Sequence, residues 1–99
     1  MSSRLRLSIV DPTGLHARPA ARFVQAASRF ASRVTVEHAG READAKSLIG
    51  LLSLALRPGS LIELVAEGDD ENEAITALAG ELAPYVREAD TATTERGDR

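Results

Sequence analysis

The chain is 99 residues long, enough for one domain with a single hydrophobic core. Hydrophobic residues make up 43% and charged residues 27%, the balance of an ordinary globular protein rather than of a disordered or fibrous one. There is no cysteine, so disulfides, thiolate metal sites and thiol catalysis are excluded. No apolar run has the length of a signal peptide or a membrane span, so we expect a cytoplasmic protein without membrane insertion.

The net charge of −3 is unevenly distributed along the chain. Residues 1–41 carry seven arginines against two acids, whereas residues 42–99 carry five basic and thirteen acidic residues. This asymmetry is typical of a protein with one face toward anions or acidic partners, and equally of two solvated faces. Nucleic acid is a poor fit, because there is no basic run and only three aromatic residues are available for stacking.

Two periodicities predict the secondary structure. Strict alternation of polar and apolar residues indicates half-buried strands, and apolar residues three and four positions apart indicate amphipathic helices. Turn residues separate these segments, notably Asp11-Pro12-Thr13-Gly14, which suits a type I turn. The predicted elements are strands at 4–9, 33–37, 41–43 and 61–67, and helices at 17–30, 48–56 and from Asp70 to about Val86.

The element order is therefore β-α-β-β-α-β-α. Short, half-polar strands, two of them joined by a hairpin turn at 38–40, favour an α+β open-faced sandwich: a four-stranded, mostly antiparallel sheet with three helices on one face. Asp70 and Glu73 form a pair resembling a capping box at the start of the last helix. We expect one domain over residues 1–89, followed by a disordered polar tail at 90–99.

One of the two histidines lies where its ring could take part in a reaction. His38 falls in the predicted hairpin turn, where we expect a solvated residue without a role. His16 falls at the start of the first helix, where the N–H groups of Ala17 and Arg18 have no intrahelical partner and favour an anion. A neutral imidazole nitrogen can attack phosphorus, and a phosphate on it would lie over those N–H groups, with the Arg18 guanidinium nearby. A helix cap is the alternative role of His16.

The segment from Ser47 to Leu56 has two notable features, and each of them can be interpreted in two ways. Ser47 precedes the 48–56 segment and is either a helix cap or a phosphorylation site. The second role is possible because the N-terminus of a helix also stabilises a phosphate group. The segment that follows is apolar on nearly every side. It is either buried in the core or partly exposed as a docking patch. The residues assemble no metal site and no nucleotide-binding glycine pattern, so we expect neither a metal nor a cofactor.

Two stretches of this sequence resemble a known family. Gly14-Leu15-His16-Ala17-Arg18-Pro19-Ala20 is similar to the active-site motif of HPr, the histidine-containing phosphocarrier of the bacterial phosphoenolpyruvate-dependent phosphotransferase system. The stretch from Ala45 to Leu54 resembles the second HPr motif, which surrounds a regulatory serine. The similarity extends from about Arg4 to Tyr85 with matching element order.

The resemblance implies a role for each motif. His16 would accept a phosphoryl group on Nδ1 from phosphorylated enzyme I and pass it to an enzyme IIA, with Arg18 assisting the transfer. Ser47 matches the serine that an HPr kinase/phosphorylase modifies in some bacteria. The docking surface implied for these partners consists of Leu48, Ile49 and Leu52.

We therefore expect a monomeric phosphocarrier, an intermediate in phosphoryl transfer rather than a free-standing catalyst. The alternative within the same chemistry serves nitrogen or carbon control, or a dihydroxyacetone kinase system. The alternative from another class is a regulatory module in which phosphorylated Ser47 binds a transcription regulator and phosphoryl transfer is secondary.

Overall fold

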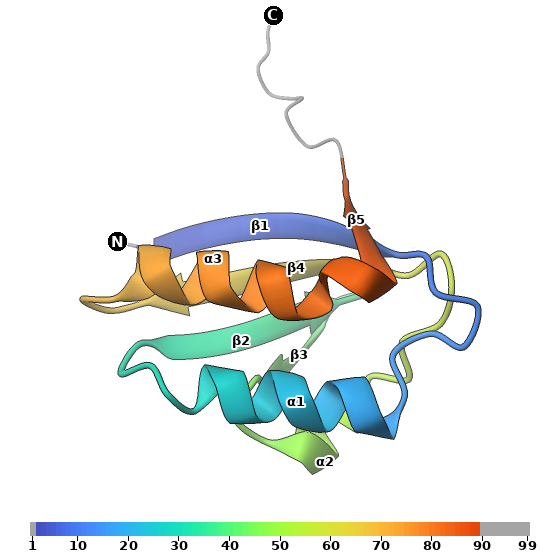
Figure 1. The fold of residues 1–99 in the computed structure, drawn as a ribbon, viewed down its shortest axis with the longest axis horizontal. Coiled ribbons are helices and arrows are strands. Elements are labelled where there is room, and N and C mark those ends of the chain that lie inside the picture. Colours follow the sequence, from blue (N-terminus) through green and yellow to red (C-terminus); the bar gives the residue numbers. More distant parts are fainter. Residues whose placement is uncertain (1, 90–99) are drawn as a thin grey trace, which may run out of the picture.

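The computed structural model describes residues 2–89, which form one antiparallel sheet covered on one face by helices (Figure 1). The strand order across the sheet is β3-β2-β4-β1-β5, and every neighbouring pair is antiparallel. In chain order the elements are β1 (Ser2–Ile9), α1 (Ala17–Ala27), β2 (Arg33–His38), β3 (Arg41–Asp44), α2 (Leu48–Leu52), β4 (Leu61–Glu67), α3 (Glu71–Leu82), the 3₁₀ turn η1 (Ala83–Tyr85) and β5 (Val86–Glu88).

The strand register follows from the alternation in the sequence. Leu7 of β1 lies opposite Ile62 of β4, and Leu64 of β4 lies opposite Val36 of β2. These side chains share one face of the pleated sheet and are buried, whereas the polar residues between them face outward. The alternation expected for three of the strands is therefore confirmed, and it puts the core on the helix side.

The helices close the core over that face. Figure 1 shows α1 and α3 side by side across the sheet, with α2 against α1. Phe23 of α1 and Leu78 of α3 are each at most 1% exposed. The apolar stripes predicted for both helices therefore face the core, at the spacing that an amphipathic helix requires.

The sheet has five strands in the described residues, not the four that the sequence predicts. The last helix was expected to continue to about Val86, but α3 ends at Leu82 and one 3₁₀ turn follows. Pro84 lies in that turn and has no N–H to donate, so the α-helical hydrogen-bond pattern cannot pass through it. Val86 is extended instead and lies opposite Ile9 on β1.

The predicted capping box of α3 is wrong. Asp70 is the residue before the helix, but its side chain makes no cap hydrogen bond. The Asp70 carboxylate instead accepts hydrogen bonds from the loop between α1 and β2, and Glu71 accepts the Gly68 N–H at 3.2 Å. The predicted tail at 90–99 lies outside the described residues.

Candidate functional site

His16 is the residue immediately before α1, and its imidazole is exposed. Its backbone is extended (φ −95°, ψ −175°), and its carbonyl accepts the Ala20 N–H at 3.0 Å, which is the first hydrogen bond of the helix. The side chain makes no cap hydrogen bond. The alternative role of His16 as a side-chain cap is therefore excluded by the geometry.

The first turn of α1 has backbone hydrogen-bond donors without acceptors, next to His16. Within residues 2–89 neither the Ala17 N–H nor the Arg18 N–H donates a hydrogen bond, and both residues are exposed. Pro19, the third residue of the helix, has no N–H and is buried against the core. The helix start thus offers two backbone donors and the positive end of a helix dipole to an anion next to His16.

The loop before His16 is held by a tight turn. The Gly14 N–H donates to the Asp11 carbonyl at 2.9 Å, as the predicted type I turn requires. The Asp11 carboxylate accepts hydrogen bonds from the Thr13 N–H (3.0 Å) and the Thr13 hydroxyl. The Thr13 hydroxyl, then its N–H and, less strongly, the charge of His16 lower the pKa of Asp11. The turn therefore keeps a carboxylate near the histidine.

Gly14 is the point at which this loop meets the segment after α2. Its φ is +70°, and a Cβ placed there would lie 2.4 Å from the carbonyl oxygen of Leu56. That same oxygen accepts the Leu15 N–H at 3.2 Å. Only glycine allows both the positive φ and this close backbone approach, so the loop before His16 is held against the segment that follows the second motif.

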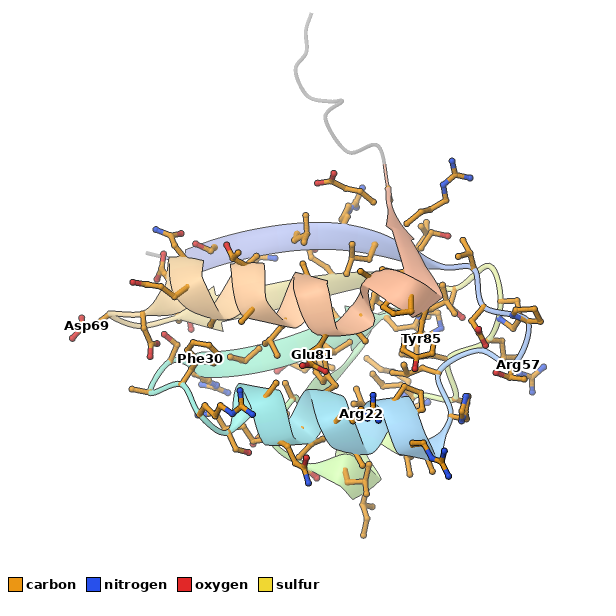
Figure 2. The ribbon with its side chains drawn as sticks, in the orientation of Figure 1. Arg22, Phe30, Arg57, Asp69, Glu81 and Tyr85 are labelled. Atoms are coloured by element: carbon orange, nitrogen blue, oxygen red, sulfur yellow. The ribbon has the colours of Figure 1, made fainter. Side chains whose placement is uncertain are left out.

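Arginines accompany the Asp11 carboxylate at this end of the molecule. Arg18 and Arg22 extend from α1, and the Cα of Arg57 lies 3.0 Å from the position that a Cβ on Gly14 would take. Figure 2 shows Arg57 and Tyr85 at the end of the molecule where α1 begins. Among residues 2–89 the only ion pairs are those of Arg4 with Glu37 and Glu63, on the open face of the sheet. The arginines near His16 are therefore available to an anion.

Ser47 caps α2. Its hydroxyl accepts the Gly50 N–H at 3.0 Å, and its carbonyl accepts the Leu51 N–H at 2.9 Å. The cap interpretation is confirmed. Because the side chain is only half-buried, this geometry also leaves the phosphorylation interpretation open.

The apolar segment around α2 divides between the core and the surface. Leu51, Leu54 and Leu56 are buried. Ile49 is 83% exposed and Leu52 is 38% exposed, whereas Leu48 is half-buried against the core. The interpretation of the whole segment as core is therefore wrong, since five residues of helix cannot bury all of its sides.

Comparisons with known proteins agree with this geometry. The family model described as "PTS HPr component phosphorylation site" matches residues 4–83. The chain belongs to the HPr family. It is 56% identical over 66 residues to the HPr-like protein Crh of Halalkalibacterium halodurans, a match that covers 67% of this chain and 79% of that protein.

Solved structures of HPr-family proteins share the fold. A histidine-containing phosphocarrier protein from Mycoplasma superposes with a TM-score of 0.81 at 30% identity, covering 83% of this chain and 93% of the other. Crh of Bacillus subtilis superposes with a TM-score of 0.67 at 49% identity, covering 74% and 84%. Its structure is described as that of a catabolite repression protein and as a domain-swapped, intertwined dimer.

For two residues of this HPr-family chain the structure adds to what the sequence indicates: Arg57 was not singled out from the sequence, and the expectation for His38 is corrected. The backbone of Arg57 lies beside Gly14, two residues before His16, through a tertiary contact that no sequence spacing reveals. His38 is not a solvated turn residue: it ends β2, and its Nδ1 donates to the Leu61 carbonyl at 2.8 Å. Within residues 2–89 no helix is long and apolar enough to cross a membrane.

Proposed function

We propose that this HPr-family chain carries a phosphoryl group on Nδ1 of His16, accepting it from phosphorylated enzyme I and passing it to an enzyme IIA. One observation supports this most: the His16 ring caps nothing and lies exposed beside the unpaired N–H groups of Ala17 and Arg18. A structural histidine at a helix start would use its ring in the cap. A carrier needs the ring free.

The proposed step exchanges one bond to phosphorus for another. The lone pair of the neutral imidazole attacks the donor's phosphorus, and the bond between phosphorus and the donor breaks as the new N–P bond forms. The two N–H groups of Ala17 and Arg18 and the Arg18 guanidinium would bind the phosphoryl oxygens. Because this site is exposed to solvent, these interactions are of moderate strength, and the phosphoryl group can be transferred to the next acceptor.

The test is the intact mass of the protein after incubation with phosphoenolpyruvate and a purified bacterial enzyme I. We expect one added phosphoryl group that is lost in mild acid and is absent from His16→Ala. Arg18→Ala should still accept the group but more slowly, whereas Arg29→Ala, which removes an exposed arginine just beyond the far end of the same helix, should match the parent rate. A parent protein without any mass change with several enzymes I would contradict the proposal.

The regulatory alternative also has an observation in its favour, the similarity to two Crh proteins. In that reading phosphorylation of Ser47 by an HPr kinase/phosphorylase produces the active form, which binds a transcription regulator. The capped and half-exposed hydroxyl of Ser47 is compatible with it. Incubation with ATP and such a kinase, followed by mass analysis of the parent and Ser47→Ala, tests this alternative separately from His16.

The remaining parts of the proposal are its setting and its docking surface. We infer a cytoplasmic protein that works as a monomer without a metal or cofactor. Ile49 and Leu52, with Leu48 behind them, would contact enzyme I and enzyme IIA. The exposure of Ile49 supports this assignment, because an isoleucine 83% exposed on a five-residue helix contributes little to the core.

A further inference from the structure

The fifth strand of the sheet covers part of one edge of β1. Val86 lies opposite Ile9, Arg87 opposite Ser8, and the Ala89 N–H donates to the Arg6 carbonyl at 3.0 Å. Just before β5, the Val10 N–H donates to the Tyr85 carbonyl at 2.9 Å. The family model ends at residue 83, so β5 lies beyond the part that this chain shares with it.

Without β5, the outermost strand on this side of the sheet would be β1. It is eight residues long and alternates regularly, and its unpaired N–H and C=O groups would form a template for another strand. With β5 in place, the outermost strand is only three residues long, and its Arg87 and Glu88 are exposed. Short length and charge are the features by which natural sheets protect an edge from pairing.

The opposite edge of the sheet is protected in the same way. It is formed by β3, which is four residues long and carries three exposed charged residues. Both outermost strands in the described part of the chain are thus short and charged. On this side β1 is covered only from Arg6 to Val10, and within residues 2–89 the stretch Ser2–Leu5 has no partner there. The covered stretch includes Leu7 and both of its neighbours along the strand.

The partner that would best fit an uncovered β1 edge is the β1 strand of a second copy. An antiparallel pair centred on Leu7 places Leu5 opposite Ile9, and Arg6 opposite Ser8. In this register apolar residues meet on the core face, and no two arginines stand directly opposite each other. The pair would be symmetric, as two-fold dimers require.

We propose that β5 keeps this chain monomeric by occupying the β1 edge that a second copy would otherwise pair with. The proposal concerns assembly and does not depend on the chemistry of His16. It assigns a role to residues 86–89, for which the family comparison offers none.

A proline substitution in the full chain tests the proposal. Hydrogen-bonded and non-hydrogen-bonded pairs alternate in an antiparallel ladder, so Arg87–Ser8 is the bonded pair between Ala89–Arg6 and Tyr85–Val10. Arg87→Pro removes the N–H that points toward β1. Glu88→Pro is the matched control, because its N–H points away from β1 and an edge strand tolerates proline there.

We expect Arg87→Pro to form a dimer as its concentration rises from micromolar to millimolar, so that its mass by sedimentation or light scattering doubles. The parent and Glu88→Pro should remain monomers. Amide hydrogen exchange locates the interface: the β1 amides should be less protected in the Arg87→Pro monomer, and their protection should return as the dimer forms.

A second pair of variants tests the same point by shortening the chain. Ending the chain at Val86 removes the rest of β5 but keeps the Tyr85 carbonyl and the contact of Val86 with the core. Ending it after Ala89 keeps β5 whole. We expect a dimer only from the shorter chain. Monomers from both Arg87→Pro and the chain ending at Val86, or a parent protein that is itself dimeric with β5 paired to β1, would overturn the proposal.

Discussion

The carboxylate of Asp70 accepts three hydrogen bonds from Ala31 and Ser32, which lie far from it along the chain. One carboxylate oxygen accepts the Ser32 N–H at 2.9 Å and also the Ser32 hydroxyl, and the other accepts the Ala31 N–H at 2.9 Å. Ser32 is 2% exposed and is the one buried polar residue found in the described chain. The contact joins the loop after α1 to the residue that precedes α3, so it fixes how the two helices sit over the sheet.

This contact predicts a loss of stability in acid. The Ser32 hydroxyl, then the N–H groups around it, lower the pKa of Asp70 below its ordinary value of 3.8. A carboxyl whose pKa is lowered by folding stabilises the native state above the unfolded pKa, and this contribution is lost as the pH falls through the folded pKa. We expect the thermal midpoint of the parent protein to fall more steeply below pH 3.8 than that of Asp70→Asn.

The control for this measurement is Asp69→Asn, because Asp69 precedes the same helix and is exposed at the tip of the molecule (Figure 2). Its pH profile should follow that of the parent. Parallel profiles for the parent and Asp70→Asn would show that the contact with Ser32 does not couple folding to pH.

Gly14→Ala should be more damaging than the same change at Gly40. Both residues have positive φ, which costs an alanine about 1–2 kcal/mol. Only at Gly14 would the new Cβ overlap the Leu56 carbonyl oxygen, and relieving such overlap costs about 1–3 kcal/mol more. Urea unfolding of the two variants measures the difference. Equal losses would mean that the loop before His16 moves freely.

Ile49→Asp should separate docking from stability. We expect its free energy of unfolding to stay within about 0.5 kcal/mol of the parent value, because the side chain is on the surface. Phosphoryl transfer from enzyme I should slow by about tenfold, which corresponds to 1.4 kcal/mol. Leu61→Asp is the control: Leu61 is 60% exposed on the open face of the sheet. Equal transfer rates for the two variants would argue against a docking role for Ile49.

Substitutions at Ser47 can distinguish the charge of a phosphate from the loss of the cap. Ser47→Ala should cost about 0.5–2 kcal/mol, since the hydroxyl that accepts the Gly50 N–H is lost. Ser47→Asn and Ser47→Asp both keep a cap, but only the aspartate adds negative charge beside the proposed docking surface. We expect His16 phosphorylation to slow in Ser47→Asp alone. The same rate in Ser47→Asp and Ser47→Asn would refute regulation by charge at this position.

The sequence by itself determined the fold class, the order of the first four strands along the chain and the location of His16 at the start of a helix. Alternation and helical spacing are local properties, so the strand containing Leu7 and the helix containing Phe23 can both be predicted from neighbours along the chain. The turn before His16 is equally local, because its residue types favour one backbone conformation. The two HPr motifs could also be found from sequence, since each is a continuous stretch.

Tertiary structure alone decided the features that join distant segments. Asp70 has the residue type of a helix cap, yet its carboxylate is used by Ser32, because the fold brings two N–H donors and a hydroxyl within its reach. Arg57 lies beside the loop that precedes His16 only because a glycine allows the two backbones to meet at Gly14 and Leu56. Val86 continues a helical apolar pattern, but Pro84 ends the helix and the open edge of β1 accepts the extended chain. Local sequence patterns indicate which conformations and hydrogen bonds a residue favours. Which of them it adopts depends on the neighbouring groups that the tertiary fold places within its reach.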